Sequence, residues 1–203
     1  LDGRETVRRI QEFSRTRRDR RFTAVDLGEI LRDVVEITRP RWKSEFEGRD
    51  VTIEVEADTA IVPPVLGNPA ELREVFTNLV LNAVDAMPSG GSLRLACRRE
   101  GQRVVGTVAD TGTGMTEEVQ RQIFDPFFTT KGSRGMGLGM SVVYGILTRH
   151  GVEIDVATAV NRGTTFTLRF EVTDQALQPA GGDGAAMPQL VRPGRILVID
   201  DEA

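Results

Sequence analysis

A glycine-rich stretch between residues 111 and 139 limits the possible folds of this sequence more than any other feature. Six glycines lie in it, and Thr116 is placed to start one short helix there. A predicted strand precedes the stretch, and a predicted helix from about 140 to 150 follows it. Neither glycine cluster completes G-x-x-x-x-G-K-[ST] or G-x-G-x-x-G, so the two common nucleotide-binding folds are disfavoured. We expect the stretch to form a long lid.

Hydrophobic periodicity predicts helices and strands on both sides of this stretch. Asp26 and Glu29 form a capping box that starts one helix, and Pro40 is expected to end it. Asn68 and Pro69 start a second helix, which runs to about residue 87. Alternating apolar residues predict strands near 51–55, 92–99, 103–110, 152–159 and 164–172. This order predicts an α+β fold, a two-layer α/β sandwich with a mixed sheet on one side and helices on the other.

Composition divides the chain into four parts. We expect residues 1–21 to be the end of an arginine-rich helix, 22–174 a compact domain, 175–194 a linker and 195–203 the first strand of a truncated further domain. The arginines form either a solvated helix face or a site for an anionic ligand. The net charge of −4 argues against nucleic acid as a main partner.

Cysteine content and hydropathy bear on where the chain works. Cys97 lies in an apolar strand, so we expect it to fill the core, and a single cysteine builds no disulfide framework. No apolar stretch approaches the ~20 residues of a membrane helix, and no secretory signal opens the sequence. We expect this portion to be soluble and cytoplasmic, with any membrane attachment of a longer parent lying upstream.

Two polar elements have the chemistry of a nucleotide site. Asn78 and Asn82 lie one helical turn apart, so their amide oxygens share a helix face on which Mg²⁺ could find an oxygen ligand. Asp110 follows an apolar strand, where its carboxylate could accept from an exocyclic amine such as that of adenine. Gly112 and Gly114 would let a flat base approach the backbone.

A third element, Gly135–Gly139, opens a helix whose free N–H groups favour phosphate, and Lys131 adds a positive charge nearby. Each element also has an ordinary structural explanation: surface amides, a turn aspartate or a flexible loop. From the residues alone, both explanations stay open.

Taken in order, these motifs resemble those of the histidine kinase ATPase domain, of the nitrogen-regulator-like type. The matching segments are Asn78–Ala83, Asp110–Gly114, Phe124–Lys131, Gly135–Gly139 and Gly163–Phe166, which resemble the N box, the first glycine box, the F box and the last two glycine boxes. The resemblance covers residues 68–170 and implies the Bergerat-type ATP-binding fold, with ATP and Mg²⁺ as cofactors.

The resemblance also implies roles for individual residues. Asn82 would ligate Mg²⁺, Asp110 would hold the adenine amine with help from Thr164, and Lys131 would cradle the phosphates with the Gly135–Gly139 backbone. The other residues implied at the nucleotide are Asn78, Asp85, Gly112, Gly114, Met115, Thr130, Gly135, Gly137, Leu138 and Gly139. Met136 departs from the family's frequent threonine. We expect Phe124, Phe127 and Phe128 to pack the lid against the domain rather than to stack on the base.

One position separates the possible activities. Gyrase-like, mismatch-repair and chaperone ATPases resemble this domain but carry a glutamate one turn before the metal-binding asparagine. Here that residue is Asn78, whose amide cannot accept a proton at neutral pH. This favours phosphoryl transfer to a protein side chain. A hydrolytic ATPase and a nucleotide-gated scaffold without enzymatic activity are the alternatives.

The phosphate acceptor is expected outside this sequence. His150, the only histidine, is interpreted as a charged partner of a helix C-terminus. Residues 1–21 resemble the end of a dimerisation hairpin, whose acceptor histidine would lie upstream of Leu1 in a homodimeric parent. The segment 196–202 resembles the first strand of a response-regulator receiver domain, in which Asp200 and Asp201 would hold Mg²⁺; the alternative is an apolar strand with a charged end. These resemblances predict a hybrid kinase.

Overall fold

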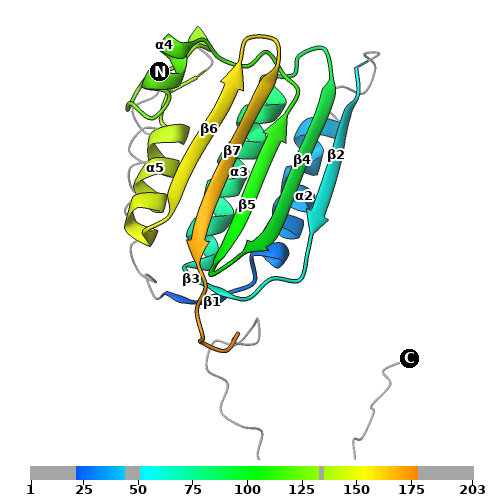
Figure 1. Ribbon diagram of the computed structural model, residues 1–203. Coiled ribbons are helices and arrows are strands. Elements are labelled where there is room, and N and C mark those ends of the chain that lie inside the picture. Colours follow the sequence, from blue (N-terminus) through cyan, green and yellow to red (C-terminus); the bar gives the residue numbers. More distant parts are fainter. Residues whose placement is uncertain (1–21, 44–50, 133–134, 178–203) are drawn as a thin grey trace, which may run out of the picture.

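The computed structural model describes residues 22–43, 51–132 and 135–177. They form a five-stranded mixed sheet with helices on one face, as predicted (Figure 1). The strand order is β2-β4-β5-β7-β6, in which β2 and β4 are parallel and the other pairs are antiparallel. The bounds are β2 Ile53–Thr59, β4 Gly91–Glu100, β5 Arg103–Asp110, β6 Glu153–Ala159 and β7 Gly163–Glu171. The predicted 51–55 strand therefore begins two residues later and continues to Thr59.

Helix α2 (Leu27–Lys43) does not end at Pro40, so that prediction was wrong. Proline removes one i→i−4 hydrogen bond, but here the residue lies on the exposed side of the last turn, where water can reach the freed carbonyl. Beyond it, Trp42 packs against the core and Arg41 pairs with Asp85 at 3.2 Å. These contacts hold the final turn in helical form. At the other end, Asp26 Oδ1 accepts from the Gly28 N–H at 2.8 Å, as expected for a cap.

Helix α3 (Pro69–Asp85) begins as the sequence predicts. The Asn68 side chain accepts a hydrogen bond from the Glu71 N–H at 3.0 Å, and Pro69 occupies the first turn, where no N–H is needed. The predicted starts of two further helices are confirmed to within a residue. These are α4 (Glu117–Gln122), which Thr116 caps, and α5 (Gly139–His150). No helix in the described ranges is long and apolar enough to cross a membrane.

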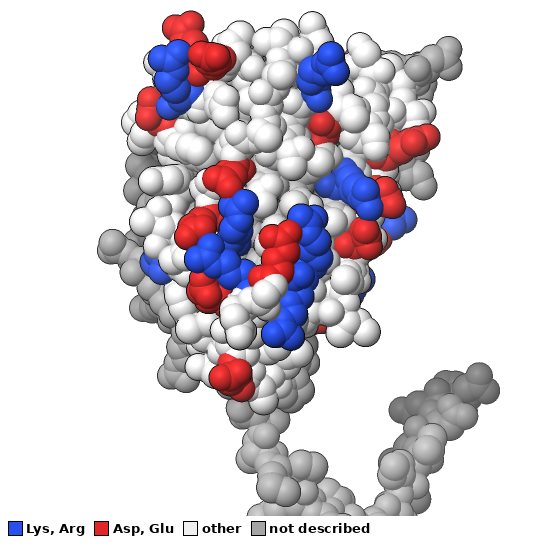
Figure 2. All heavy atoms as spheres, in the orientation of Figure 1, with Lys and Arg blue, Asp and Glu red and all other residues white. Residues whose placement is uncertain are grey.

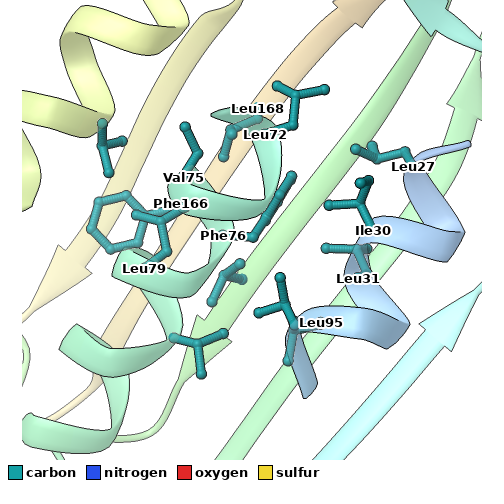
Figure 3. Packing of buried hydrophobic residues seen from close by; sticks show 14 of the residues in the cluster. Leu27, Ile30, Leu31, Leu72, Val75, Phe76, Leu79, Leu95, Phe166 and Leu168 are labelled. Carbon is teal, nitrogen blue, oxygen red and sulfur yellow. The ribbon is translucent and has the colours of Figure 1, made fainter. Parts of the chain in front are cut away.

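The core lies between the helices and the sheet (Figure 3). Leu27, Ile30 and Leu31 from α2 and Leu72, Phe76 and Leu79 from α3 are almost completely buried. They pack on inward-facing strand residues such as Leu95 and Leu168. Cys97 is buried among them, as expected, and its pKa is raised by burial. The other face of the sheet carries intermixed arginines and carboxylates, for example Arg94 with Asp58 and Arg103 with Glu153 (Figure 2).

A two-stranded ribbon not predicted from the sequence joins the ends of the domain. Strand β1 (Thr23–Val25) pairs with β3 (Val65–Gly67), and β3 in turn bridges to Val172 just after β7. The Thr173 N–H also donates to the Pro64 carbonyl at 2.9 Å. The described chain therefore enters and leaves at the same end of the sheet (Figure 1).

His150 lies beside this ribbon and is not the charged helix partner predicted from the sequence. Its side chain is fully buried and stacks on Phe22, with 4.4 Å between ring centroids. Nε2 accepts from the Asn68 N–H at 3.0 Å, so Nδ1 carries the proton and donates to the Ile146 carbonyl at 2.9 Å. Burial lowers the pKa of the ring, and the Arg149 charge adds to this, while the Ile146 hydrogen bond and Glu71 oppose it. The ring is therefore a neutral link between α5 and the start of α3.

This environment gives the stability a predictable pH dependence. The His150 pKa is lower in the folded chain than the ~6.5 of an exposed histidine. The contribution of the neutral ring to the free energy of unfolding is therefore complete above pH ~6.5 and is lost as the pH falls below that value. We expect His150→Gln, which keeps an acceptor for the Asn68 N–H, to flatten the fall in unfolding free energy between pH 7.5 and 5.5. The flattening is at most about 1.4 kcal/mol per pH unit, measured by urea denaturation. Equal slopes in both proteins would contradict this reading.

Candidate functional site

A cationic side chain joins two predicted site residues at the C-terminal end of α3. Lys131 Nζ lies 2.9 Å from Asn82 Oδ1 and 2.7 Å from Asp85 Oδ2. Asp85 also pairs with Arg41 through its other oxygen. Three residues predicted separately therefore meet in one cluster, although the sequence interpretation placed Lys131 at the phosphates instead. Arg41 was not predicted, because nothing in the α2 pattern distinguishes it from a surface arginine.

Asn78 lies one turn back on the same face of α3 but has a different environment. Its amide donates to the Glu74 carbonyl of its own helix at 3.0 Å. A side chain added at Gly139 would lie 3.2 Å from Asn78 Oδ1, so this asparagine sits against the first residue of α5. Glu74 is the next acidic residue towards the start of the helix; it is exposed at the surface, and partial desolvation together with the Glu71 charge raises its pKa.

A second cluster lies at the opposite end of the sheet from the β1–β3 ribbon, where β5 ends. Asp110 is buried, with 7% of its surface exposed, and its Oδ1 accepts from the N–H groups of Gly112 at 2.8 Å and Thr164 at 3.3 Å. Burial raises the pKa of the carboxyl, and the two hydrogen bonds oppose the rise. The β5–β7 register pairs Asp110 directly with Thr164. Two predicted contacts of the adenine end are thus neighbours.

The two glycines after Asp110 pack against the chain's own backbone. A Cβ on Gly112 would lie 2.4 Å from the Ala86 carbonyl oxygen, and one on Gly114 would lie 1.9 Å from that of Ala159. Gly114 also has a φ of +61°, which disfavours other residues. The sequence interpretation explained these glycines by the approach of a base. Close packing of the loop on α3 and on the β6–β7 turn is the reason that the structure gives.

Thr158 on β6 is a candidate residue that the motifs missed. Its hydroxyl accepts from the Met115 N–H at 3.0 Å and lies 3.1 Å from the Thr164 hydroxyl. It thereby ties two predicted site residues together. Thr158 pairs across the β6–β7 hairpin with Thr164, so the hairpin register is the signal that would have found it.

Residues 115–138 and the start of α5 carry the remaining predicted residues. Helix α5 follows Leu138, whose side chain makes no cap hydrogen bond, so no side chain of the N-cap residue satisfies the first N–H groups of the helix. Thr130 is exposed and Leu138 is 37% exposed, and neither is drawn into the two clusters. Phe124 packs near Tyr144 at 5.2 Å, in keeping with lid packing, but Phe127 is 75% exposed with a φ of +70° and does not pack as expected. Asp200, Asp201 and residues 1–21 lie outside the described residues.

The described chain is a mixed sheet covered by helices on one face, with polar clusters at the end of one helix and of one strand, and its sequence contains no Walker motif. Residues 67–174 match the family model described as "Histidine kinase-, DNA gyrase B-, and HSP90-like ATPase". The chain belongs to this family, and it carries the histidine kinase type of ATP-binding domain, to which the following relatives point.

Among curated proteins, the chain is 35% identical to sensor kinase CckA of Brucella abortus over 80% of this chain and 18% of that protein. It is 34% identical to sensor histidine kinase ZraS of Klebsiella oxytoca over 79% of this chain and 34% of that protein. The chain thus spans about a fifth to a third of these relatives.

Solved structures agree in fold. The nucleotide-free catalytic domain of histidine kinase ThkA matches with a TM-score of 0.63 and 27% identity, over 74% of this chain and 95% of that one. Full-length ShkA in complex with AMPPNP matches with a TM-score of 0.66 and 26% identity, over 78% of this chain and 33% of that one.

Proposed function

We propose that this domain transfers the γ-phosphoryl group of ATP to a histidine on a helical hairpin of the same protein. In that reaction the bond from the γ-phosphorus to the β–γ bridging oxygen breaks, a P–N bond to the imidazole forms, and ADP leaves. The observation that carries the proposal is Asn78, an amide whose N–H₂ is engaged with Glu74 at the position where a hydrolytic relative would carry a carboxylate. Without a base there, water is a poor acceptor.

A divalent cation fits the Lys131 cluster. The ammonium group already lies between a carboxylate oxygen and an amide oxygen, which are the donor types that Mg²⁺ takes from proteins. We propose that Asn82, with Asp85 beside it, holds Mg²⁺. Bound there, the ion would neutralise charge on the phosphate oxygens. Lys131 is then released to contact phosphate, together with the free N–H groups before α5.

At the other end of the site, Asp110 accepts from the adenine amine through the carboxylate oxygen that the Gly112 and Thr164 N–H groups do not use. Met115 and Gly114 follow in the same loop. The two clusters together hold the nucleotide by its base and by its phosphates, which fixes the γ-phosphoryl group for in-line transfer.

The proposal extends to parts of the chain outside the described residues. We propose that residues 1–21 end the dimerisation hairpin of a homodimeric, cytoplasmic kinase, and that 22–174 is its catalytic domain. The segment 175–194 is then a linker, and 195–203 begins a receiver whose aspartate accepts the phosphoryl group next. The shift to alanine, glycine and proline after residue 175 supports the linker, and the resemblances of the first and last segments support the other two boundaries.

The test supplies labelled ATP and Mg²⁺ to this chain with and without its native upstream hairpin. We expect little phosphate release by the chain alone and an acid-labile phosphohistidine when the hairpin is present. Sustained release that Glu74→Gln abolishes would replace the proposal by the hydrolytic ATPase. Binding of ATP with no transfer to the hairpin would favour the non-enzymatic scaffold.

A further inference from the structure

The Thr158 hydroxyl is saturated by three neighbours. It accepts from the Met115 N–H at 3.0 Å, lies 3.0 Å from the Gly163 carbonyl oxygen, and lies 3.1 Å from Thr164 Oγ1. A threonine hydroxyl has one proton and two lone pairs, so three contacts use it completely.

The chemistry of two of these neighbours fixes the direction of their bonds, and the third direction follows if all three contacts are to be hydrogen bonds at once. A carbonyl can only accept and a backbone N–H can only donate. The Thr158 hydroxyl therefore donates a hydrogen bond to the Gly163 carbonyl oxygen and accepts one from the Met115 N–H. One lone pair of the hydroxyl is left to accept from the Thr164 hydroxyl. The Thr164 proton is in this way committed to Thr158, and Thr164 Oγ1 offers only lone pairs to anything else that reaches it.

Thr164 stands directly beside Asp110. The two residues pair in register across β5 and β7, both are buried, and the Thr164 N–H donates to Asp110 Oδ1. With its proton committed, Thr164 Oγ1 joins the Asp110 carboxylate as a second acceptor. Two adjacent acceptors suit an amine, which has two N–H donors, and leave a carbonyl oxygen unpaired.

We propose that Thr158 is a positioning residue which, through Thr164, makes the site select a purine with an exocyclic amine over one with a carbonyl at that position. The inference rests on the proposed function in that ATP is the nucleotide bound. Thr158 itself need not touch the base. Thr158 acts by keeping the Thr164 hydroxyl proton in a hydrogen bond that points away from the base.

The test compares the dissociation constants of ATP and GTP for the wild-type chain, Thr158→Val and Thr158→Ser. Valine has the same shape but cannot accept, so the Thr164 proton becomes free to donate to a carbonyl. We expect the preference for ATP over GTP to fall about tenfold in Thr158→Val and to be restored in Thr158→Ser. An unchanged preference in a folded Thr158→Val protein, or an equal loss for both nucleotides, overturns the proposal.

A second variant keeps the test independent of whether Thr158→Val folds. Thr164→Val removes the second acceptor directly and should lower the same preference, while the double variant should lower it no further. Because Asp110 still accepts from the amine, part of the preference should remain; a preference for ATP that is unchanged in Thr164→Val overturns the inference. Equal binding of ATP and GTP by the wild-type protein also overturns the inference but leaves the kinase proposal standing. Selective binding of ATP without phosphoryl transfer to the hairpin contradicts the kinase proposal alone.

Discussion

Asp110→Asn is expected to weaken ATP binding on the order of 100-fold without destabilising the fold. The asparagine oxygen can still accept from the Gly112 and Thr164 N–H groups. Its N–H₂ group then replaces the acceptor that faces the adenine amine, so two donors oppose each other. Isothermal titration with ATP measures the loss.

The expected stability of this variant follows from the sign of the pKa shift. The Asp110 pKa is raised in the folded chain, so the ionised carboxylate costs folding free energy at every pH above its unfolded value. Replacing it by a neutral amide removes that cost, and the midpoint of thermal unfolding should stay the same or rise. The matched control is Asp58→Asn on the open face of the sheet, which should alter neither property. Asp110→Asn protein with wild-type affinity would refute the assigned role.

Asn82→Ala is expected to abolish the gain in ATP affinity that Mg²⁺ provides. Loss of outer-sphere partners alone weakens metal sites by about 10–100-fold, and Asn82 is proposed as a direct ligand, so we expect roughly 100-fold weaker binding in Mg²⁺. In EDTA the affinity of the variant should match that of the wild type. Dissociation constants in the two buffers separate the metal effect from a change in the pocket.

Asn82→Asp is the companion variant, because it keeps an oxygen at the same place. It should recover most of the Mg²⁺-dependent binding. The proposed ligand would be wrong if Asn82→Ala lost equal affinity with and without the ion.

The main helices and strands could be predicted because their burial is periodic. In β7 the residues Phe166, Leu168 and Phe170 alternate with outward-facing ones, and α3 has both a cap and an apolar stripe. The β1–β3 ribbon could not be predicted, since three-residue strands are too short to show a period and their partners lie far apart in sequence. The prediction that Pro40 ends α2 was wrong because the exposure of this proline, which lets the helix continue past it, depends on the tertiary fold.

The sequence could name candidate site residues one by one but not their arrangement in space. Motif order pointed to Asp110, Asn82 and Lys131, yet the Lys131 contacts depend on the path of the lid segment, which sequence spacing does not define. The buried, neutral state of His150 likewise depends on Phe22 and Asn68, which approach it from distant parts of the chain.

The ribbon that gathers both ends of the described chain has a mechanical consequence. Strand β5 is 8 residues long, so at ~3.3 Å per residue Asp110 lies ~25 Å from the other end of the strand, the end nearer the β1–β3 ribbon (Figure 1). Both ends of the described chain therefore lie at the end of the domain away from Asp110 (Figure 1). A rotation of the domain about that end would carry Asp110 through the widest arc, and the contacts around Asp110 would move with it as one body.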